Sequence, residues 1–260
     1  MSVAMRISVP ANSLTQITMP WRRALLAGLA LMTALLPAAA GPEARRMSVV
    51  ELFTSQGCSS CPPADALLKT YADRPDVVAL TLNVDYWDYL GWKDTLASPK
   101  YTKRQRRYAK AFGGQPYTPQ VVVNGAEHVI GSHAAEIDSA IERTRARLQT
   151  AAVPLALVSD GRTLTIEIGA GSLHGLSGTV WLAAVRPRVD VDIERGENRG
   201  RKLSYFNVVR ELTPVGMWSG NPVRLELPHG EILRADERCA VWLQVEATGH
   251  IVAAAWMSPR

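Results

Sequence analysis

The chain has 260 residues, of which 47% are hydrophobic and 20% are charged. This composition supplies enough apolar material for a folded core and excludes an intrinsically disordered chain. Lysine and arginine together number 29 against 24 acidic residues, but Arg6, Arg22 and Arg23 lie in the first 40 residues, which carry no acidic group. The remainder balances 26 basic against 24 acidic residues, a net charge of +2. We therefore expect no nucleic-acid partner.

The first 40 residues have the pattern of a secretory signal peptide. Basic residues precede an apolar run at 24–36, and Pro37 and the small residues Ala38-Ala39-Ala40 follow it. A membrane anchor is the alternative, but the run is shorter than the roughly 20 residues that span a bilayer. We expect cleavage near Ala40, no stable membrane span afterwards, and a location in the periplasm or outside the cell. The pair Arg22-Arg23 leaves the export route open.

Only three cysteines are present: Cys58, Cys61 and Cys239. Disulfides persist in the periplasm and outside the cell, whereas the cytosol keeps thiols reduced. A small scaffold held together by disulfides would need more cysteines and a shorter chain. We therefore expect chemistry, and not scaffolding, from the pair at 58 and 61. Cys239 lies inside an apolar segment and is expected to be a buried small hydrophobic residue.

Hydrophobic periodicity divides the first half of the exported chain into alternating strands and helices. Short apolar runs bounded by small polar residues and prolines predict strands, and apolar positions three or four residues apart predict helices. Asn124-Gly125 is a strong signal for a two-residue hairpin turn. The predicted strands are 47–53, 77–84, 120–123 and 127–130, and the predicted helices lie between Pro62 and Arg74, at 100–112 and at 132–149. Residues 85–117 form a polar, aromatic-rich insertion.

Beyond Thr150 the pattern changes to short alternating or apolar runs separated by turn signals, which is typical of an all-β sandwich. The predicted strands are 155–158, 163–168, 179–185, 223–227 and 239–245. The acidic and basic segment 190–201 is expected to be an exposed hairpin tip, because it lacks the defined pattern of a calcium-binding loop. No motif in this half indicates what it does.

Cys58-Ser59-Ser60-Cys61 is a C-x-x-C motif placed between a predicted buried strand and a predicted helix, a context that makes it a redox signal. At this spacing the two sulfurs can close a bond, so that one thiolate attacks a substrate disulfide and the other resolves the mixed disulfide. We expect Cys58 to be the nucleophile and Cys61 the resolving thiol. The start of the helix should stabilise the Cys58 thiolate through the amides of Ser60 and Cys61 and through the helix dipole.

Residues 50–65, which contain this motif, resemble the DUF1223 family of secreted bacterial proteins. Further segments that resemble the family's pattern are 83–92, 117–120 and 207–212. The resemblance implies a thioredoxin-like fold. We therefore expect an α/β thioredoxin-like domain over 41–150 that carries the C-x-x-C motif, followed by a β-rich, sandwich-like domain over 151–260.

The thioredoxin superfamily resemblance also implies a substrate cleft. Such folds place a cis-proline against the cysteine pair, and Thr118-Pro119 stands where that proline is expected, at the start of the predicted strand 120–123. An X-Pro bond adopts the cis form at low cost, so the fold can impose it there. Thr118 would then offer its backbone to a substrate strand. Trp87 and Trp92, in the long insertion, are candidates for the same substrate surface, although such aromatics belong to cores more often.

The predicted function is thus an exported thiol–disulfide oxidoreductase that acts on protein or small thiol substrates and needs no cofactor. A purely structural disulfide is one alternative, but such a tight loop closes little chain and stabilises little. The second is a copper-binding chaperone or redox adaptor that uses the same cysteines, with His128 or His133 as a distant ligand. Zinc is disfavoured, because the chain has no second C-x-x-C motif. The partner is expected to be a protein thiol, a disulfide substrate or a redox partner; the oligomeric state stays open.

Overall fold

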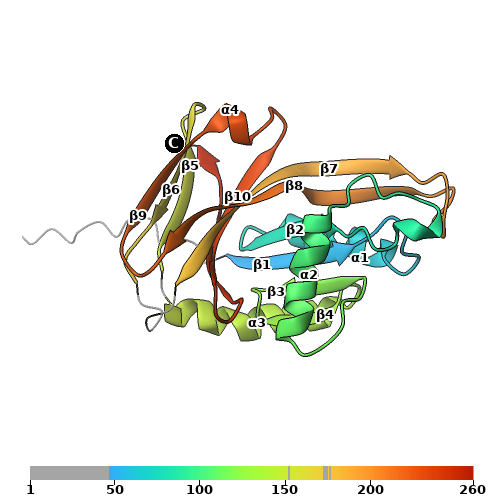
Figure 1. Ribbon diagram of the computed structural model, residues 1–260, viewed down its shortest axis with the longest axis horizontal. Helices are drawn as coiled ribbons and strands as arrows, with labels where there is room; N and C mark the ends of the chain where they lie inside the picture. Colours follow the sequence, from blue (N-terminus) through green and yellow to red (C-terminus); the bar gives the residue numbers. More distant parts are fainter. Residues whose placement is uncertain (1–46, 152, 172–174, 176, 260) are drawn as a thin grey trace, which may run out of the picture. The chain divides into compact units, whose positions relative to one another are not determined.

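The computed structural model describes residues 47–151, 153–171, 175 and 177–259 (Figure 1). The predicted signal peptide lies outside the described residues. Within them, no helix combines the length and the hydrophobicity that a bilayer crossing requires.

The described residues form a mixed α/β structure. The strands are β1 (Ser48–Thr54), β2 (Val77–Asn83), β3 (Gln120–Val123), β4 (Glu127–Ile130), β5 (Leu155–Ser159), β6 (Thr163–Ile168), β7 (Gly178–Asp192), β8 (Lys202–Trp218), β9 (Val223–Pro228), β10 (Arg238–Val245), β11 (Ile251–Trp256) and β12 (Ser258–Pro259). The helices are α1 (Pro62–Ala72), the 3-10 helix η1 (Asp88–Leu90), α2 (Pro99–Ala111), α3 (Ala134–Ala151) and α4 (His229–Ile232).

The strands make two sheets. The larger has the order β11-β10-β7-β8-β2-β1-β3-β4, and the smaller has the order β12-β5-β6-β9. In the large sheet β1 runs parallel to β2, and β2 runs parallel to β8, while the other neighbours are antiparallel. The pairing of β2 with β8 aligns Thr81 with Val208, and the Thr81 hydroxyl donates to the Phe206 carbonyl oxygen at 2.6 Å.

This topology corrects the predicted fold class. A thioredoxin-like domain followed by a separate sandwich is wrong, because four strands from beyond residue 150 continue the sheet that β1 to β4 begin. The hairpin of β7 and β8 extends from the small sheet along the whole large sheet (Figure 1). The physical reason is that the edge of β2 that faces away from β1 offers unpaired backbone groups, and β8 pairs with this edge at Thr81.

Alternating side chains of the large sheet supply two cores, one on each face. On one face α1 and α3 cover Val50, Leu52, Val121 and their neighbours, and on the other α2 covers Val49, Phe53 and theirs. A third core lies between β7 and β10 and the small sheet. All seven residues of β1 and of β2 are buried, which explains why β2 reads as a nearly continuous apolar run and not as an alternating one. In β1 the burial includes a charged residue, Glu51.

The predicted strands and helices of the first half are confirmed. The connection from β3 to β4 has three residues, Asn124, Gly125 and Ala126, one more than predicted, and Asn124 and Gly125 have positive φ, of 50° and 61°. These are the values that favour Asn-Gly in such turns. The Asn124 side chain also accepts a hydrogen bond from the Val49 amide at 2.7 Å, so the turn is tied to β1.

One buried charge pair joins α2 to the sheet. The Arg104 guanidinium donates to the Glu51 carboxylate of β1 through Nε at 2.6 Å and Nη2 at 3.0 Å, and to Gln244 of β10 through Nη1 at 3.0 Å. The Tyr108 hydroxyl donates to the same carboxylate at 2.6 Å. The guanidinium lies over the Tyr108 ring at 5.1 Å and over two tryptophan rings, Trp181 and Trp242. Burial alone would lower the pKa of Arg104. The nearby Glu51 and Tyr108 together have a larger effect, so the pKa of Arg104 is raised.

Candidate active site at the C-x-x-C loop

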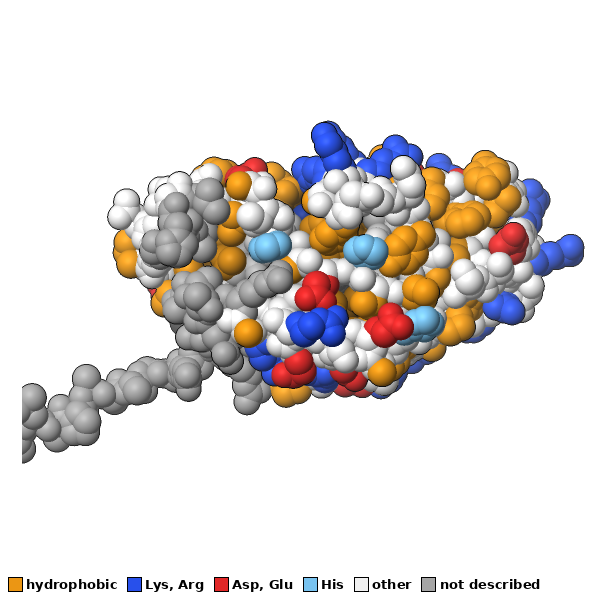
Figure 2. Space-filling view, turned by 90° about the horizontal axis from the view of Figure 1, so that it is seen from below, with side chains coloured by type: hydrophobic (Ala, Val, Ile, Leu, Met, Phe, Trp, Pro, Cys, Tyr) orange, Lys and Arg blue, Asp and Glu red, His pale blue; other side chains and the backbone are white. Residues whose placement is uncertain are grey.

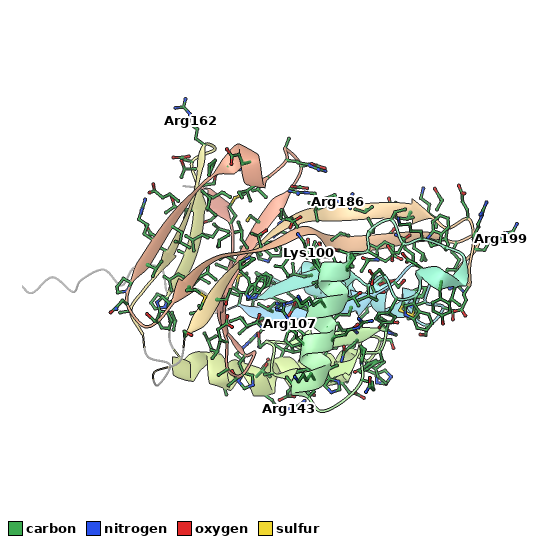
Figure 3. The ribbon with its side chains drawn as sticks, in the orientation of Figure 1. Lys100, Arg107, Arg143, Arg162, Arg186 and Arg199 are labelled. Atoms are coloured by element: carbon green, nitrogen blue, oxygen red, sulfur yellow. A yellow bond between two sulfur atoms is a disulfide. The ribbon has the colours of Figure 1, made fainter. Side chains whose placement is uncertain are left out.

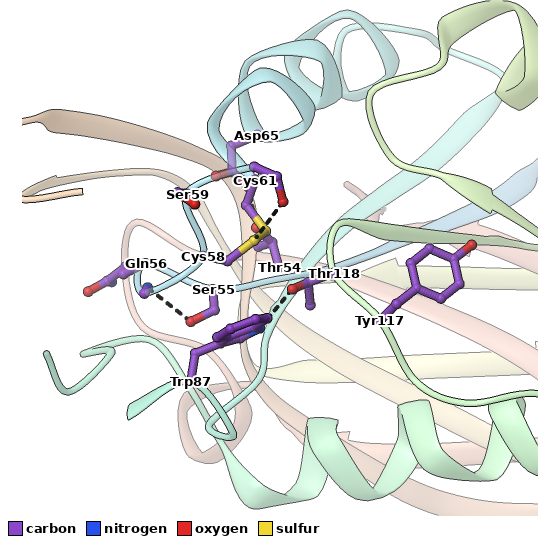
Figure 4. The surroundings of a disulfide bond; sticks show 12 residues. Thr54, Ser55, Gln56, Cys58, Ser59, Cys61, Asp65, Trp87, Tyr117 and Thr118 are labelled. Atoms are coloured by element: carbon purple, nitrogen blue, oxygen red, sulfur yellow. Dashed lines mark hydrogen bonds between the residues drawn. A yellow bond between two sulfur atoms is a disulfide. The ribbon is translucent and has the colours of Figure 1, made fainter. Parts of the chain in front are cut away.

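Cys58 and Cys61 form a disulfide at the junction between β1 and α1, with Cα atoms 5.4 Å apart (Figure 4). Cys58 is 2% exposed and Cys61 is fully buried, whereas Ser59 and Ser60 between them are exposed. The Ser60 hydroxyl lies 3.4 Å from the Cys58 sulfur. Both cysteines are therefore buried beside two exposed serines, and Cys58 retains slightly more exposed surface than Cys61.

The hydrogen bonds at the start of α1 differ in part from the prediction. The helix begins at Pro62, and Cys61 is its N-cap residue. The Cys61 amide donates to the Cys58 carbonyl oxygen at 3.2 Å, and not to the Cys58 sulfur. In the disulfide form, the polar group nearest to that sulfur is thus the Ser60 hydroxyl, which can donate to a thiolate once the bond opens.

Gln56, two residues before the disulfide, is fixed on every polar atom. Its amide donates to Asp94 at 2.7 Å, and its side-chain oxygen accepts from Trp92 Nε1 at 2.8 Å and from the Thr95 amide at 3.3 Å. Its side-chain nitrogen donates to the Thr95 hydroxyl at 3.2 Å. The long insertion between β2 and α2 therefore clamps the loop that carries the cysteines, which is the kind of preorganisation that a reactive site needs.

Thr118 and Pro119 also lie at this site, and the peptide bond between them is cis, as predicted. Trp87 Nε1 donates to the Thr118 hydroxyl at 2.8 Å, and Figure 4 shows both among the residues around the disulfide. A Cβ on Gly57 would lie only 3.1 Å from the Trp87 Cβ, so the absence of a side chain there allows this approach. Pro119 is buried beside the first turn of α1. The structure thus gathers all six predicted site residues around the disulfide.

Asp65 is a buried carboxyl group that the sequence analysis did not single out. It lies one helical turn after Cys61, and its amide donates to the Cys61 carbonyl oxygen at 3.1 Å. Its Oδ1 accepts from the Thr54 hydroxyl at 2.7 Å, whereas its Oδ2 is buried without a hydrogen-bond partner. Burial raises the pKa of Asp65 to about 8, against the lowering effect of Thr54 and with a smaller contribution from the Asp94 charge. Asp65 therefore holds a proton at neutral pH.

Asp65→Asn is expected to remove a pH dependence of stability. The native carboxyl keeps its proton up to about pH 8, whereas in the unfolded chain its pKa is 3.8. Because the native state binds more protons between these values, the free energy of unfolding falls as the pH rises from about 4 to about 8. The loss is up to about 1.4 kcal/mol per pH unit. Urea unfolding at a series of pH values should give a shallower decline for the variant, and equal declines would contradict the assignment.

A residue from the second half also reaches the loop. Asn198, in the connection between β7 and β8, donates from its side chain to the carbonyl oxygens of Gln56 and Cys58. Segment 190–201 is a hairpin tip, as predicted, but it is not wholly exposed, because Asn198 is 1% exposed and Ile193 2%. Nothing in the local sequence indicates this contact, since 140 residues separate Asn198 from Cys58.

The two histidines considered for copper lie elsewhere. His128 on β4 is exposed, shares a hydrogen bond with the Tyr117 hydroxyl at 2.9 Å and packs on Phe112. His133 pairs with Glu136 at 2.9 Å on the surface. Across the described ranges, no group of three or more His, Cys, Asp and Glu side chains has an arrangement that could hold a metal ion.

Cys239 is a free cysteine, fully buried in the core between the two sheets, as predicted. Burial raises the pKa of its thiol to about 12, and the nearby Glu237 adds to the effect. A thiol in this state is unreactive at neutral pH, since the thiolate is the nucleophile.

Comparison with known proteins gives a family and several similar solved structures. A family model described as "Protein of unknown function (DUF1223)" matches residues 49–244. No curated protein matches the chain. A crystal structure of a protein from Agrobacterium tumefaciens is 39% identical, covers 80% of this chain and 92% of its own, and has a TM-score of 0.70.

Two further structures come from Porphyromonas gingivalis. HBP35 is 12% identical, covers 82% of this chain and 74% of its own, and has a TM-score of 0.48. A domain of the outer membrane lipoprotein Omp28 is 13% identical, covers 42% of this chain and 91% of its own, and has a TM-score of 0.19. Both TM-scores are too low to support an argument about fold or function.

Proposed function

The chain belongs to the DUF1223 family, as its motifs indicated, and because that family is described as one of unknown function we propose an activity from the residues themselves. The protein is a thiol–disulfide oxidoreductase of the cell envelope that uses the Cys58–Cys61 pair. Its substrates are protein thiols and disulfides or small thiols. Export by the signal peptide places it in the periplasm or outside the cell, where such a pair can cycle between its two forms.

A single observation carries this proposal: the disulfide lies at the start of α1 and encloses the exposed Ser59 and Ser60, and Cys58, at 2% exposure, is the less buried of its two cysteines. A purely structural bond between residues only three apart would stabilise the fold little. The surrounding clamp on Gln56 and the hydrogen bond from Trp87 to Thr118 support a role for that loop beyond packing.

The reaction proceeds in two exchanges. A substrate thiolate attacks the Cys58 sulfur, the Cys58–Cys61 bond breaks, and Cys61 leaves as a thiolate. A second substrate thiolate then attacks the mixed disulfide, which releases the oxidised substrate and leaves the protein as a dithiol. In the reverse direction Cys58 attacks a substrate disulfide, and Cys61 resolves the mixed disulfide. Pro119 and Thr118 flank the position that the substrate occupies.

We propose that Asp65 exchanges a proton with the buried Cys61 sulfur during the reaction. Its carboxyl lies one helical turn beyond Cys61 and is not in hydrogen-bond contact with the sulfur. In this proposed exchange it gives a proton to the Cys61 thiolate through one water molecule as that thiolate leaves. The same group can take the proton back when Cys61 resolves a mixed disulfide. In Asp65→Asn, the pH profile of exchange is expected to lose its step near pH 8.

The test uses the exported protein without its leader. The oxidised protein is mixed with reduced glutathione, and the loss of the protein disulfide and the appearance of glutathione disulfide are followed over time. In a second assay, the dithiol form is tested for its ability to reduce insulin disulfides. We expect complete, reversible exchange of one disulfide per chain. Cys239→Ser serves as the matched control and should behave like the wild type, because Cys239 is buried. A disulfide that glutathione does not reduce in the folded protein would remove the proposal.

A further inference from the structure

The tip of the β7–β8 hairpin, residues 193–201, is built to hold one side chain in a fixed orientation. Its backbone closes through hydrogen bonds from Ile193 to Arg201 at 2.9 Å and from Gly200 to Ile193 at 2.7 Å. Asn198 Oδ1 accepts from Arg201 Nη1 at 3.2 Å. Because the oxygen of the amide is engaged within the tip, its nitrogen faces the other way, toward the C-x-x-C loop.

That nitrogen meets two carbonyl oxygens of the loop at once. Asn198 Nδ2 lies 2.9 Å from the Gln56 oxygen and 2.9 Å from the Cys58 oxygen, and the side chain is buried. Beside it, Glu197 Oε2 accepts from the Ser59 amide at 3.3 Å. The tip therefore contacts the backbone of the loop two residues before the first cysteine, at that cysteine and at the residue after it.

We propose that Asn198 is a positioning residue of the disulfide, which holds the backbone around Cys58 and thereby sets the equilibrium between the disulfide and the dithiol. The inference rests on the proposed function, in which this pair is the redox-active group, and it gives the second half of the chain a part in that site. Asn198 acts through the loop and touches neither substrate nor sulfur.

The direction of the effect follows from the entropy of the dithiol. Two molecules of reduced glutathione convert the disulfide to two thiols and yield one glutathione disulfide, so two electrons and two protons pass to the protein. Once the bond is open, a loop held by Asn198 keeps the sulfurs close together, whereas a loose loop lets them separate. Reforming the bond then costs more entropy. Loss of the two hydrogen bonds should therefore favour the dithiol.

The experiment measures that equilibrium directly. Oxidised protein is equilibrated with glutathione at a series of ratios, free thiols are trapped by alkylation, and the fraction of each form is read by mass spectrometry. Asn198→Ala is expected to shift the equilibrium about tenfold toward the dithiol, which is about 30 mV for a two-electron couple. Arg199→Ala is the matched control. Arg199 is exposed, and its side chain points to solvent at the end of the hairpin (Figure 3), so this variant should match the wild type.

Thermal melting of both redox forms separates positioning from plain stabilisation. If Asn198→Ala lowers the melting temperature of both forms equally and leaves the glutathione equilibrium unchanged, Asn198 is only structural and the inference is overturned. If Asn198→Ala does not fold, Asn198→Ser keeps one donor and should show a smaller shift in the same direction; no shift would overturn the inference. A wild type that catalyses no exchange, yet has an equilibrium that depends on Asn198, would refute the proposed function alone.

Discussion

Cys58→Ser is expected to reduce catalysed disulfide exchange to the background rate. The hydroxyl that replaces the thiol does not attack disulfides at neutral pH, and no disulfide can then form within the motif. Cys61 is not expected to substitute for it, because Cys61 is fully buried at the N-cap of α1, whereas Cys58 retains 2% exposure. The measurement is the rate of insulin reduction by the dithiol form, relative to glutathione without protein.

Cys61→Ser should separate the two exchanges. Cys58 can still attack a substrate disulfide, but the resolving thiol is absent, so a mixed disulfide at Cys58 accumulates and can be detected by intact mass. The trapped substrate would also identify the physiological partner class. Cys239→Ser in the same background should leave the trapped species unchanged. Exchange that survives in Cys58→Ser, or a mixed disulfide found on Cys239, would refute these assignments.

The parts of the site that could be predicted from the sequence are those that local patterns specify. The C-x-x-C motif, the strand before it and the helix after it lie within one short stretch of chain, and the Thr118-Pro119 bond opens a strand that is itself visible as an apolar run. Asp65 could also have been noticed, because an aspartate on the buried side of α1 is unusual. Its complete burial and raised pKa, however, depend on packing that the sequence does not display.

The parts that were missed depend on contacts between distant segments. One aligned pair, Thr81 with Val208, joins the two halves of the chain into a single sheet, and no periodicity within either segment encodes that choice. The fold class was therefore wrong although most of its strands were right. Asn198 is not predicted for the same reason, because its role depends on a contact with the C-x-x-C loop, 140 positions away in the sequence.

The two predicted tryptophans show how a role can depend on orientation. Trp87 and Trp92 lie at the site, but each gives its indole N–H to a residue of the protein, Thr118 and Gln56 respectively. Both side chains thus brace the site, whereas Tyr89 between them is 77% exposed and is the aromatic with the most surface to offer a substrate. Tyr89 is not among the substrate contacts predicted from the sequence, because exposure is set by the fold.

The second large effect concerns the buried pair beneath α2. Glu51→Gln is expected to lower the free energy of unfolding by about 3–5 kcal/mol, because it leaves the Arg104 charge buried without a carboxylate. Desolvation makes this loss far larger than at the surface, where solvent screens such pairs. Glu127→Gln is the matched control. It breaks the ion pair with the exposed Arg143. Acidic and basic side chains are mixed on this surface, the face that carries α3 (Figure 2), so solvent and other charges screen the pair. The free energy of unfolding is therefore expected to change little in Glu127→Gln.

A double variant tests whether the loss comes from the unpaired charge or from missing contacts. Glu51→Leu combined with Arg104→Met removes both charges and keeps apolar volume among Tyr108, Trp181 and Trp242. Because replacing a buried ion pair by apolar side chains is often neutral or stabilising, the double variant should regain most of the stability that Glu51→Gln loses. Urea unfolding of the wild type, the single variants and the double variant gives the comparison. A double variant as unstable as Glu51→Gln would instead show that the hydrogen bonds from α2 to β1 and β10 carry the stability.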